Sequence, residues 1–207
     1  MATKTMNPSK MTAAQAGRIS DFLTTGLRKA GFQSEAIQMV IETKGRSLTD
    51  DLVAVVRKYV EAVSNLIVRV VDVDIGRKPQ EALNATGRKQ YTDEVVVINM
   101  PKGSGGKKEV VFFKPDLTER NGYISDDDLE KEFELRGLKP ADPYSLAAVN
   151  EADPAFADDH PNGTHWKDAN GNWSFAAFDR WHDERHVYVG RNDGGWGGGW
   201  WFGGLRK

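Results

Sequence analysis

The sequence predicts an α+β protein, and three observations support this fold class. Apolar residues in positions 1–75 recur with the spacing of amphipathic helices. Two later segments, 94–99 and 109–114, are short β-branched and aromatic runs typical of strands. The last thirty residues combine glycine with tryptophan. We therefore predict a helical region over 1–75, a connector over 76–91 and a second domain over 92–207.

Three helices are predicted in the helical region. The first spans 11–30 and ends at Gly31, and a shorter helix ends near Gly45. The third spans 48–71 and begins with the capping-box spacing of Ser47–Asp50. Its apolar stripe is typical of a bundle core or an oligomer seam, so oligomerisation through the N-terminal helices stays an open alternative. The apolar face of the first helix consists of Ile19, Phe22, Leu23 and Leu27.

Turn and cap residues delimit the elements of the second domain. The segment 101–106 has a turn composition between the two predicted strands. Ser125, followed by three aspartates, predicts the start of a helix that ends near Arg136, because acidic residues in a first turn complement the helix dipole. A further short helix is predicted over 143–150, with Pro143 in its first turn.

Composition excludes several classes of site. The chain has no cysteine, which rules out disulfides, thiolate metal ligands and cysteine nucleophiles. It has no run of eighteen apolar residues and no signal-peptide core, so we expect no membrane span and, by default, a cytoplasmic location. Residues 1–120 carry 19 Lys and Arg against 14 Asp and Glu, whereas residues 121–207 carry 9 against 16. An acidic C-terminal half argues against a nucleic-acid partner there.

Histidines offer an alternative function, a metal-dependent hydrolase or nuclease. All four lie close together in the sequence, and two of them are four residues apart, as on a metal-binding helix. The segment 183–185 between that pair, however, is typical of a hairpin tip, where such spacing does not converge on one ion. The sequence specifies no third ligand and no general base, so we predict no catalytic residue, no metal site and no cofactor. The four residues are His160, His165, His182 and His186.

The tail over 178–207 is the most informative segment. Eight glycines fall between Gly190 and Gly204, interleaved with large aromatic residues. A flexible linker does not contain such aromatic residues, and an ordinary core strand does not contain so much glycine. The pattern favours large, fixed anchor residues separated by small or polar positions.

This tail resembles the variable region of variable proteins from diversity-generating retroelements. The resemblance is clearest over 123–207 and includes 138–145 and 160–168. It implies a C-type lectin-like domain over 92–207 with a variable region at about 178–204. It also implies non-catalytic recognition of variable protein or cell-surface ligands. In such systems adenines of a template are randomised during reverse transcription, and Asn codons are the usual targets.

The resemblance divides the tail into two sets, because codons without adenine in the template do not change. Residues such as Asp, His, Tyr and Gly are reachable from an Asn or Asp codon by changing adenines alone. The framework set is Trp181, Arg185, Val187, Val189, Arg191, Trp196, Trp200, Trp201, Phe202, Leu205 and Arg206. The diversified, ligand-binding set is Asp179, His182, His186, Tyr188, Gly190, Asn192, Gly194, Gly195, Gly197, Gly198 and Gly199.

Strand periodicity then predicts orientations over 186–190. The two valines are expected to face inward, while His186, Tyr188 and Gly190 face outward. In C-type lectin-like folds the terminal strands usually pair, so the resemblance places 94–99 or 108–114 beside 200–206. That pairing would seat Trp200, Phe202 and Leu205 in the core. Arg191 stands where the calcium-binding lectin motif has tryptophan, so the resemblance does not extend to sugar binding through calcium.

Overall fold

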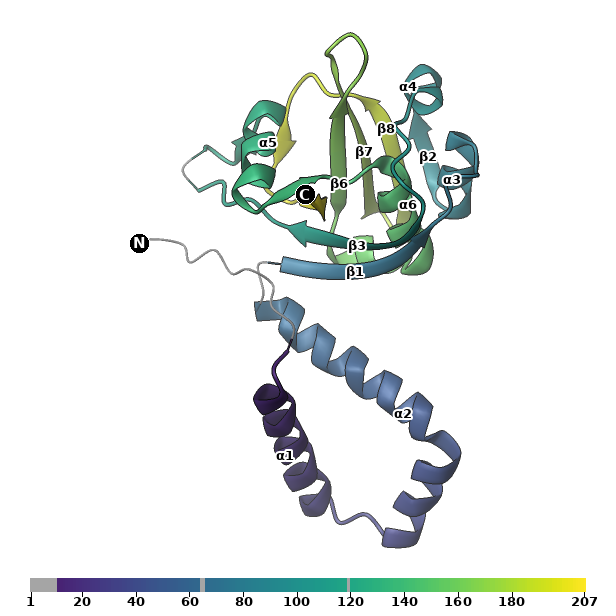
Figure 1. Ribbon diagram of the computed structural model, residues 1–207, viewed down its shortest axis with the longest axis vertical. Helices are drawn as coiled ribbons and strands as arrows, with labels where there is room; N and C mark the ends of the chain where they lie inside the picture. Colours follow the sequence, from purple (N-terminus) through teal and green to yellow (C-terminus); the bar gives the residue numbers. More distant parts are fainter. Residues whose placement is uncertain (1–10, 64–65, 119) are drawn as a thin grey trace. The chain divides into compact units, whose positions relative to one another are not determined.

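The computed structural model describes residues 11–63, 66–118 and 120–207 (Figure 1). The chain divides into two compact units, Met1–Ser64 and Asn65–Lys207. We call the first the helical unit and the second the C-terminal unit. Within the described ranges, no helix combines the length and the apolar character needed to cross a membrane.

Over its described residues, 11–63, the helical unit forms two helices, whereas three were predicted in positions 1–75. Helix α1, Ala13–Lys29, begins with a capping box between Thr12 and Gln15 and ends before Gly31, which has a φ of 68°. This agrees with the predicted first helix. Helix α2, Ser34–Val63, runs through Gly45 without interruption, so the predicted break there is wrong. A single glycine costs a helix only about 1 kcal/mol, which is too little to end one with good neighbours.

The C-terminal part of the predicted helix over 48–71 is wrong, because this segment forms strand β1, Leu66–Val73. Ile67, Val71 and Val73 are buried on one face of the strand, while Val70 is exposed. A run so rich in β-branched residues is as compatible with a strand as with a helix. The neighbouring strand decided the outcome, because β1 pairs along its whole length with β3, Gly106–Phe113.

The predicted connector over 76–91 contains two elements of the C-terminal unit. These are α3, Pro79–Ala85, and β2, Lys89–Thr92. The predicted strand over 94–99 is wrong, because this segment forms helix α4, Glu94–Ile98. The Asp93 carboxylate accepts hydrogen bonds from the backbone N–H groups of Val95 and Val96, and this N-cap starts a helix that the apolar run did not reveal.

The helices predicted after residue 125 are confirmed. Helix α5, Asp126–Leu135, begins at the predicted cap, where the Ser125 side chain accepts from the N–H of Asp128. Helix α6, Pro143–Ala152, begins with Pro143 and is capped by Asp142. The remaining short elements are β4, Tyr123–Ile124, β5, Leu138–Pro140, and α7, Phe156–Asp159.

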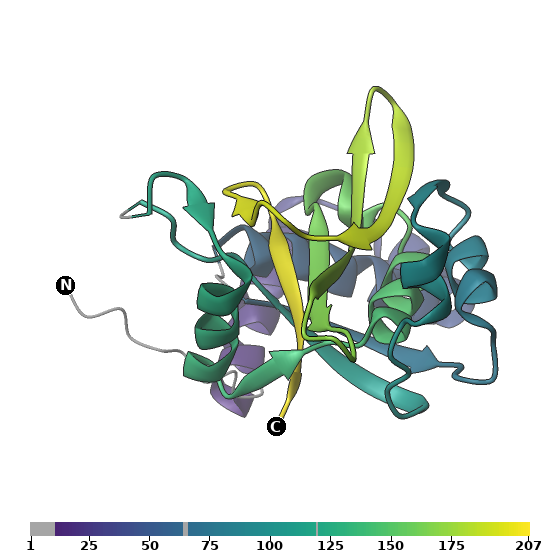
Figure 2. The same ribbon diagram turned by 90° about the horizontal axis from the view of Figure 1, so that it is seen from above.

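A mixed sheet organises the C-terminal unit. The C-terminal part of the chain supplies β6, Asn162–Lys167, β7, Trp173–Trp181, β8, Glu184–Arg191, β9, Trp196–Gly197, and β10, Trp201–Arg206. The strand order is β1-β3-β10-β6-β7-β8-β2, with β5 added beside β10. Strand β9 pairs separately with β4. Figure 2 shows the β7–β8 hairpin projecting from the sheet.

The terminal strand pairs as predicted for 108–114. Strand β10 lies antiparallel to β3, with Phe202 opposite Phe113. Phe202 is fully buried, whereas Trp200 and Leu205 are only partly buried. The placement of these last two side chains in the core is therefore correct only in part.

Two cores lie on the two faces of this sheet. Val110 and Phe112 of β3 belong to one core, and Val111 and Phe113 belong to the other, as the alternation of a strand requires. Helix α6 covers the first face and α5 the second, where Phe133 packs edge-on against Phe113. The chain is thus an α+β protein, and its sheet carries the tail residues on β7, β8 and β10.

Candidate ligand-binding surface

The structure separates the predicted ligand-binding residues into two groups. One group lies on the β7–β8 hairpin and the other on the segment 192–199, which joins β8 to β10. We call the first group the hairpin cluster and the second segment the C-terminal loop. The hairpin cluster consists of Asp179, His182, His186 and Tyr188, and Gly190 also lies on β8. The predicted positions in the C-terminal loop are Asn192, Gly194, Gly195, Gly197, Gly198 and Gly199.

Three members of the hairpin cluster are in mutual contact. Asp179 stands directly opposite His186 in the antiparallel pair. The Tyr188 hydroxyl lies 3.1 Å from Nδ1 of His186. Tyr91 of β2 contacts both rings. It stacks on Tyr188 with a centroid distance of 5.5 Å and meets His186 edge-on at 5.2 Å. The sequence offered no sign that Tyr91 belongs to this group.

Burial of His186 contradicts the prediction that it faces outward. The residue is only 4% exposed, whereas Val187 and Val189 are buried as predicted. The reason is the pairing of β8, which has β7 on one side and the parallel strand β2 on the other. A strand with neighbours on both edges and Tyr91 above it has little free surface on either face.

Burial also sets the electrostatics of this cluster. It raises the pKa of the Asp179 carboxyl, and the nearby His186 opposes that rise. Oδ1 of Asp179 lies 3.5 Å from Nδ1 of His186, too long for a good hydrogen bond. Burial likewise raises the pKa of Tyr188, with a further contribution from the Asp179 charge. Partial burial therefore disfavours the charged form of the Asp179 carboxyl.

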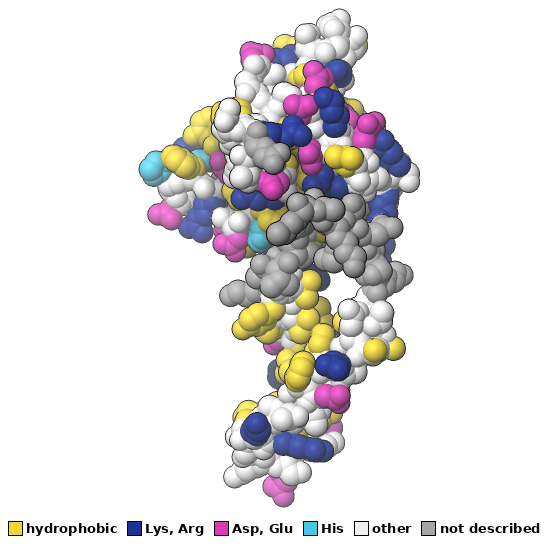
Figure 3. Space-filling view, turned by 90° about the vertical axis from the view of Figure 1, so that its left-hand side faces the viewer, with side chains coloured by type: hydrophobic (Ala, Val, Ile, Leu, Met, Phe, Trp, Pro, Cys, Tyr) yellow, Lys and Arg dark blue, Asp and Glu magenta, His cyan; other side chains and the backbone are white. Residues whose placement is uncertain are grey.

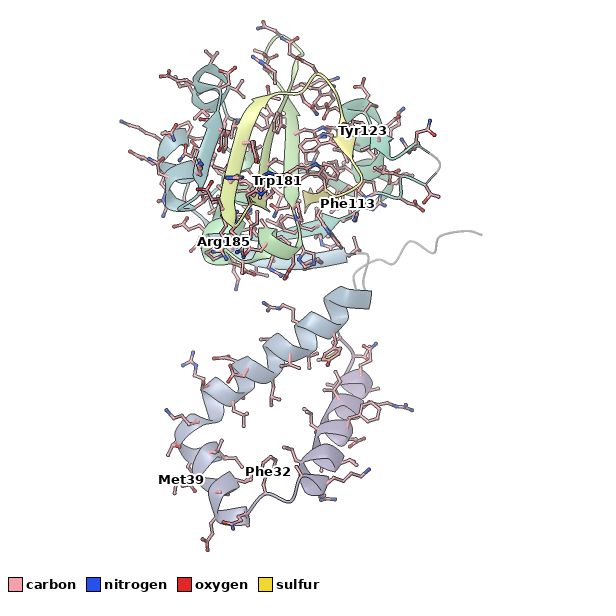
Figure 4. The ribbon with its side chains drawn as sticks, turned by 180° about the vertical axis from the view of Figure 1, so that it is seen from behind. Phe32, Met39, Phe113, Tyr123, Trp181 and Arg185 are labelled. Carbon is pink, nitrogen blue, oxygen red and sulfur yellow. The ribbon has the colours of Figure 1, made fainter. Side chains whose placement is uncertain are left out.

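At the tip of the hairpin, the structure exposes Trp181 and His182. The turn residues are His182 and Asp183, both with positive φ, while Arg185 already lies in β8. Trp181 is 62% exposed and packs edge-on against the His182 ring. Figure 4 labels Trp181 and Arg185 on this hairpin. The Arg185 guanidinium donates hydrogen bonds to the Asp158 carboxylate and lowers the pKa of that carboxyl.

The C-terminal loop borders an open pocket of about 440 Å³. Three predicted ligand-binding residues line it, Asn192, Gly194 and Gly195, together with residues from β4, α5 and β7 that the sequence did not single out. We call it the loop pocket. The other lining residues are Tyr123, Ile124, Ser125, Asp126, Asp127, Trp173 and Asp193.

A buried carboxyl group connects the loop pocket to the core. Asp126 is 5% exposed, and its oxygens accept hydrogen bonds from Asn192 at 2.7 Å and from the indole N–H of Trp196 at 2.9 Å. Nδ1 of His165 lies 2.7 Å from Oδ1 of the same carboxyl. His165 is itself buried and stacks on Trp173. This network fixes the C-terminal loop to the start of α5.

Acidic and aromatic side chains give the loop pocket its chemical character. Asp127 and Asp193 are exposed at the pocket, beside the half-buried ring of Trp173. The Lys167 ammonium lies 4.5 Å from the centre of the Trp173 ring and 3.4 Å from Asp127. Carboxylates beside an aromatic face bind cationic groups, and Lys167 of the same chain makes such a contact here.

Five of the predicted variable glycines have room for a side chain. A Cβ added at Gly194, Gly197 or Gly199 would meet no atom within 4 Å. At Gly190 and Gly198 the nearest atoms would lie at 3.5 and 3.8 Å, which is ordinary van der Waals contact. Most of the C-terminal loop can therefore carry larger residues without a change in its backbone.

Gly195 differs from these five. Its φ is +72°, and an added Cβ would lie 2.6 Å from the carbonyl oxygen of Ile124. The backbone of β4 occupies the space that a side chain would need. Gly195 must therefore remain glycine, and we remove it from the set of positions that can vary.

Glycines outside the predicted set are enclosed by core side chains. An added Cβ at Gly163 would lie 2.9 Å from the Trp196 ring. At Gly203 it would lie 3.1 Å from Leu146, and at Gly204 it would lie 3.0 Å from Phe133. These distances are shorter than normal carbon–carbon contacts. The chain thus contains glycines that the core requires beside glycines that it does not.

The four histidines have separate surroundings. His160 packs on Phe156 and Trp201, and His165 contacts Asp126. His182 lies at the hairpin tip, and His186 lies under Tyr91. Across the residues that the structure describes, no three histidine, aspartate or glutamate side chains are grouped as ligands of one metal ion.

Sequence reasoning identified the tail but not its partners in the site. Ser125 to Asp128 was interpreted only as a helix start, and nothing in that pattern shows that Asp126 would meet residues 39 to 70 positions further along. Comparison with known proteins finds no matching protein-family model, no matching curated protein and no matching solved structure.

Proposed function

We propose that the C-terminal unit is a C-type lectin-like binding module whose tail surface, within residues 178–204, is diversified by retroelement-directed mutagenesis. It recognises variable protein or cell-surface ligands without a catalytic step. The observation that carries this proposal is the difference between the glycines that have space for a side chain and those that do not. Positions that must vary need open surroundings, and positions that hold the fold need close packing.

Support comes first from the glycines of β8 and the C-terminal loop. Five glycines of the predicted variable set accept a Cβ, whereas Gly163, Gly203 and Gly204 do not. Glycine itself packs little, so a loop with open glycines has no structural reason for that composition. A surface where many residue types are sampled, and where this copy happens to carry small ones, provides a reason.

Burial of the framework residues supports the same proposal. Val187, Val189, Trp196 and Phe202 are each at most 4% exposed. A surface beside them can change its residues freely because none of these anchors has to move. Trp181, Arg191 and Arg206 depart from this pattern, because they were assigned to the framework and are exposed. An exposed tryptophan is suited to ligand contact, since aromatic residues are enriched at binding hot spots.

The structure also narrows the contact surface. His186 is buried, the Asp179 side chain is only 18% exposed, and Gly195 is confined. We therefore assign contact with ligand to the remaining positions of the C-terminal loop and to His182, Tyr188 and Gly190. The loop pocket supplies a concave centre, and its carboxylates and aromatic rings complement a cationic group on a macromolecular ligand.

DNA beside the gene tests the origin of this surface. We expect a near-repeat of the 3′ end of the gene, next to a reverse transcriptase gene. Its mismatches with the gene should fall at template adenines within codons 179–203. The Trp codons and the Gly195 codon should be spared. Sequencing of the locus in several isolates gives the answer. Mismatches at other bases, or within the Trp codons, would show that retroelement mutagenesis did not produce this tail.

Two adjacent glycines test whether the surface can vary as proposed. Gly194→Ser should change the free energy of unfolding by less than about 0.5 kcal/mol, because the site is open. Gly195→Ser should lower it by roughly 2–4 kcal/mol, because the added Cβ strikes the Ile124 carbonyl at a positive φ. Urea denaturation of both variants measures the difference. Equal losses at the two positions would mean that the space around the loop glycines does not determine which of them can vary.

A further inference from the structure

The helical unit exposes the apolar residues that should form its core. Among its side chains that the structure describes, none is buried. Most of the stability of a helix in a protein comes from packing its apolar face against other elements. Figure 3 shows hydrophobic side chains gathered over this unit, and Figure 4 labels Phe32 and Met39 within it. The exposed large residues are Met11, Phe22, Leu23, Leu27, Phe32, Met39, Val40, Ile41, Leu48, Val53, Val55, Tyr59 and Val60.

Helix α2 carries one continuous apolar stripe. Its members, which we call the α2 stripe, are Ile41, Leu48, Leu52, Val55 and Tyr59. Their separations of seven, four, three and four residues keep them on one side of the helix. Four of the five are exposed, by 55%, 39%, 53% and 71% for Ile41, Leu48, Val55 and Tyr59.

Helix α1 cannot cover all of this apolar surface. It has 17 residues, whereas α2 has 30. At about 1.5 Å per residue, α2 is the longer helix by roughly 20 Å. Phe22 and Leu27 of α1 are themselves 72% and 54% exposed, so α1 also needs a partner. Two amphipathic helices by themselves make only one line of contact, and a closed core needs more helices.

The C-terminal unit offers no apolar strip of matching length. Its own cores are closed, and the exposed large apolar side chains among its described residues are distributed over different elements. Scattered residues of this kind are normal on a protein surface. They are Val70, Ile75, Tyr91, Val95, Ile98, Tyr123, Leu135 and Trp181.

Charge does not oppose contact between two helical units. Positions 11–63 carry seven Lys and Arg residues and six Asp and Glu residues. This near-neutral balance lets two copies approach without repulsion between like charges. A stable interface draws on about 20–30 residues per partner, a number that two helices of this size supply.

We propose that a second copy of this chain covers the α2 stripe, so that α1 and α2 of the two copies form a four-helix bundle. An apolar stripe on a near-neutral helix is self-complementary, and a bundle of four helices is the smallest common arrangement that encloses such stripes. The inference concerns the helical unit alone and does not depend on the function proposed for the tail.

The mass of the full chain in solution tests the proposal. By sedimentation equilibrium the chain should have twice the mass of one copy. The variant Leu48→Glu/Val55→Glu should sediment as one copy, because it places two carboxylates in the seam. The control Thr43→Glu/Ala54→Glu adds the same charge on the opposite side of α2 and should remain at two copies. Wild-type chain that sediments as one copy, or as three or more, would overturn the two-copy bundle.

Cross-linking separates loss of the interface from loss of the helix. The chain has no cysteine, so a single introduced cysteine reports one position. Val55→Cys should form a disulfide-linked dimer under mild oxidation. The adjacent variant Ala54→Cys, on the other side of α2, should form at least tenfold less of this dimer. Both variants keep the stripe largely intact, and circular dichroism checks their helix content. Equal cross-linking at the two positions would overturn the proposed seam.

Discussion

Trp196→Ala should lower the free energy of unfolding by roughly 3–5 kcal/mol, the range of large-to-small changes in a core. The Trp196 side chain is 4% exposed and packs edge-on against Phe175 and Phe202. Its ring also lies over Gly163, where an added Cβ would come within 2.9 Å of it. Its removal leaves a cavity between the C-terminal loop and the sheet and takes a hydrogen-bond donor from Asp126.

Trp181→Ala is the matched control, since the same residue type is removed from an exposed position. It should cost less than about 1 kcal/mol, and Tyr188→Ala should cost a similarly small amount as a partly exposed residue. Guanidinium denaturation of the three variants compares them. A loss at Trp181 or Tyr188 as large as the loss at Trp196 would show that the framework and the variable surface are wrongly assigned.

Asp126→Ala should lower the free energy of unfolding by roughly 3–5 kcal/mol, because it removes the acceptor of several buried polar groups at once. The Trp196 indole N–H and the His165 ring, both buried, would lose their hydrogen-bond partner. A buried donor without an acceptor costs more than the hydrogen bond itself contributes. The Asn192 amide would also lose its anchor, so the C-terminal loop should become more mobile.

Asp127→Ala tests whether that loss comes from burial and not from the acidic start of α5. The Asp127 side chain is 73% exposed, and its contact with Lys167 is 3.4 Å long. Both residues lie in the first turn of α5, so both changes remove the same helix-dipole contribution. We expect a cost below about 1 kcal/mol for Asp127→Ala. Hydrogen exchange of the C-terminal loop should accelerate only in the Asp126 variant. Similar losses in the two variants would assign the effect to the dipole.

Elements that begin at a local signal could be predicted from the sequence. The cap of α5 at Ser125 and the start of α6 at Pro143 depend on a few adjacent residues. The alternation of Val187 and Val189 likewise needs only the period of a strand, and both are buried as expected. Such features are short-range, because a hydroxyl, a ring or a side-chain direction acts within one turn of the chain.

Apolar segments without such a signal were misassigned. The valine-rich run in β1 was interpreted as the end of a long helix, and the one in α4 as a strand. Intrinsic preferences differ by less than 1 kcal/mol between such states, so packing against neighbours outweighs them. For β1 the deciding neighbour is β3, which lies some forty residues further along the chain.

The candidate site shows the same division. The amino-acid sequence by itself determined which tail positions are small or polar and which are large. Only the tertiary structure decided that β2 would cover His186, that Ile124 would confine Gly195, and that Asp126 would hold the loop. Each of these facts joins residues far apart in sequence. Exposure and the space around a residue are properties of what packs against it, and a residue's own chemistry does not contain that information.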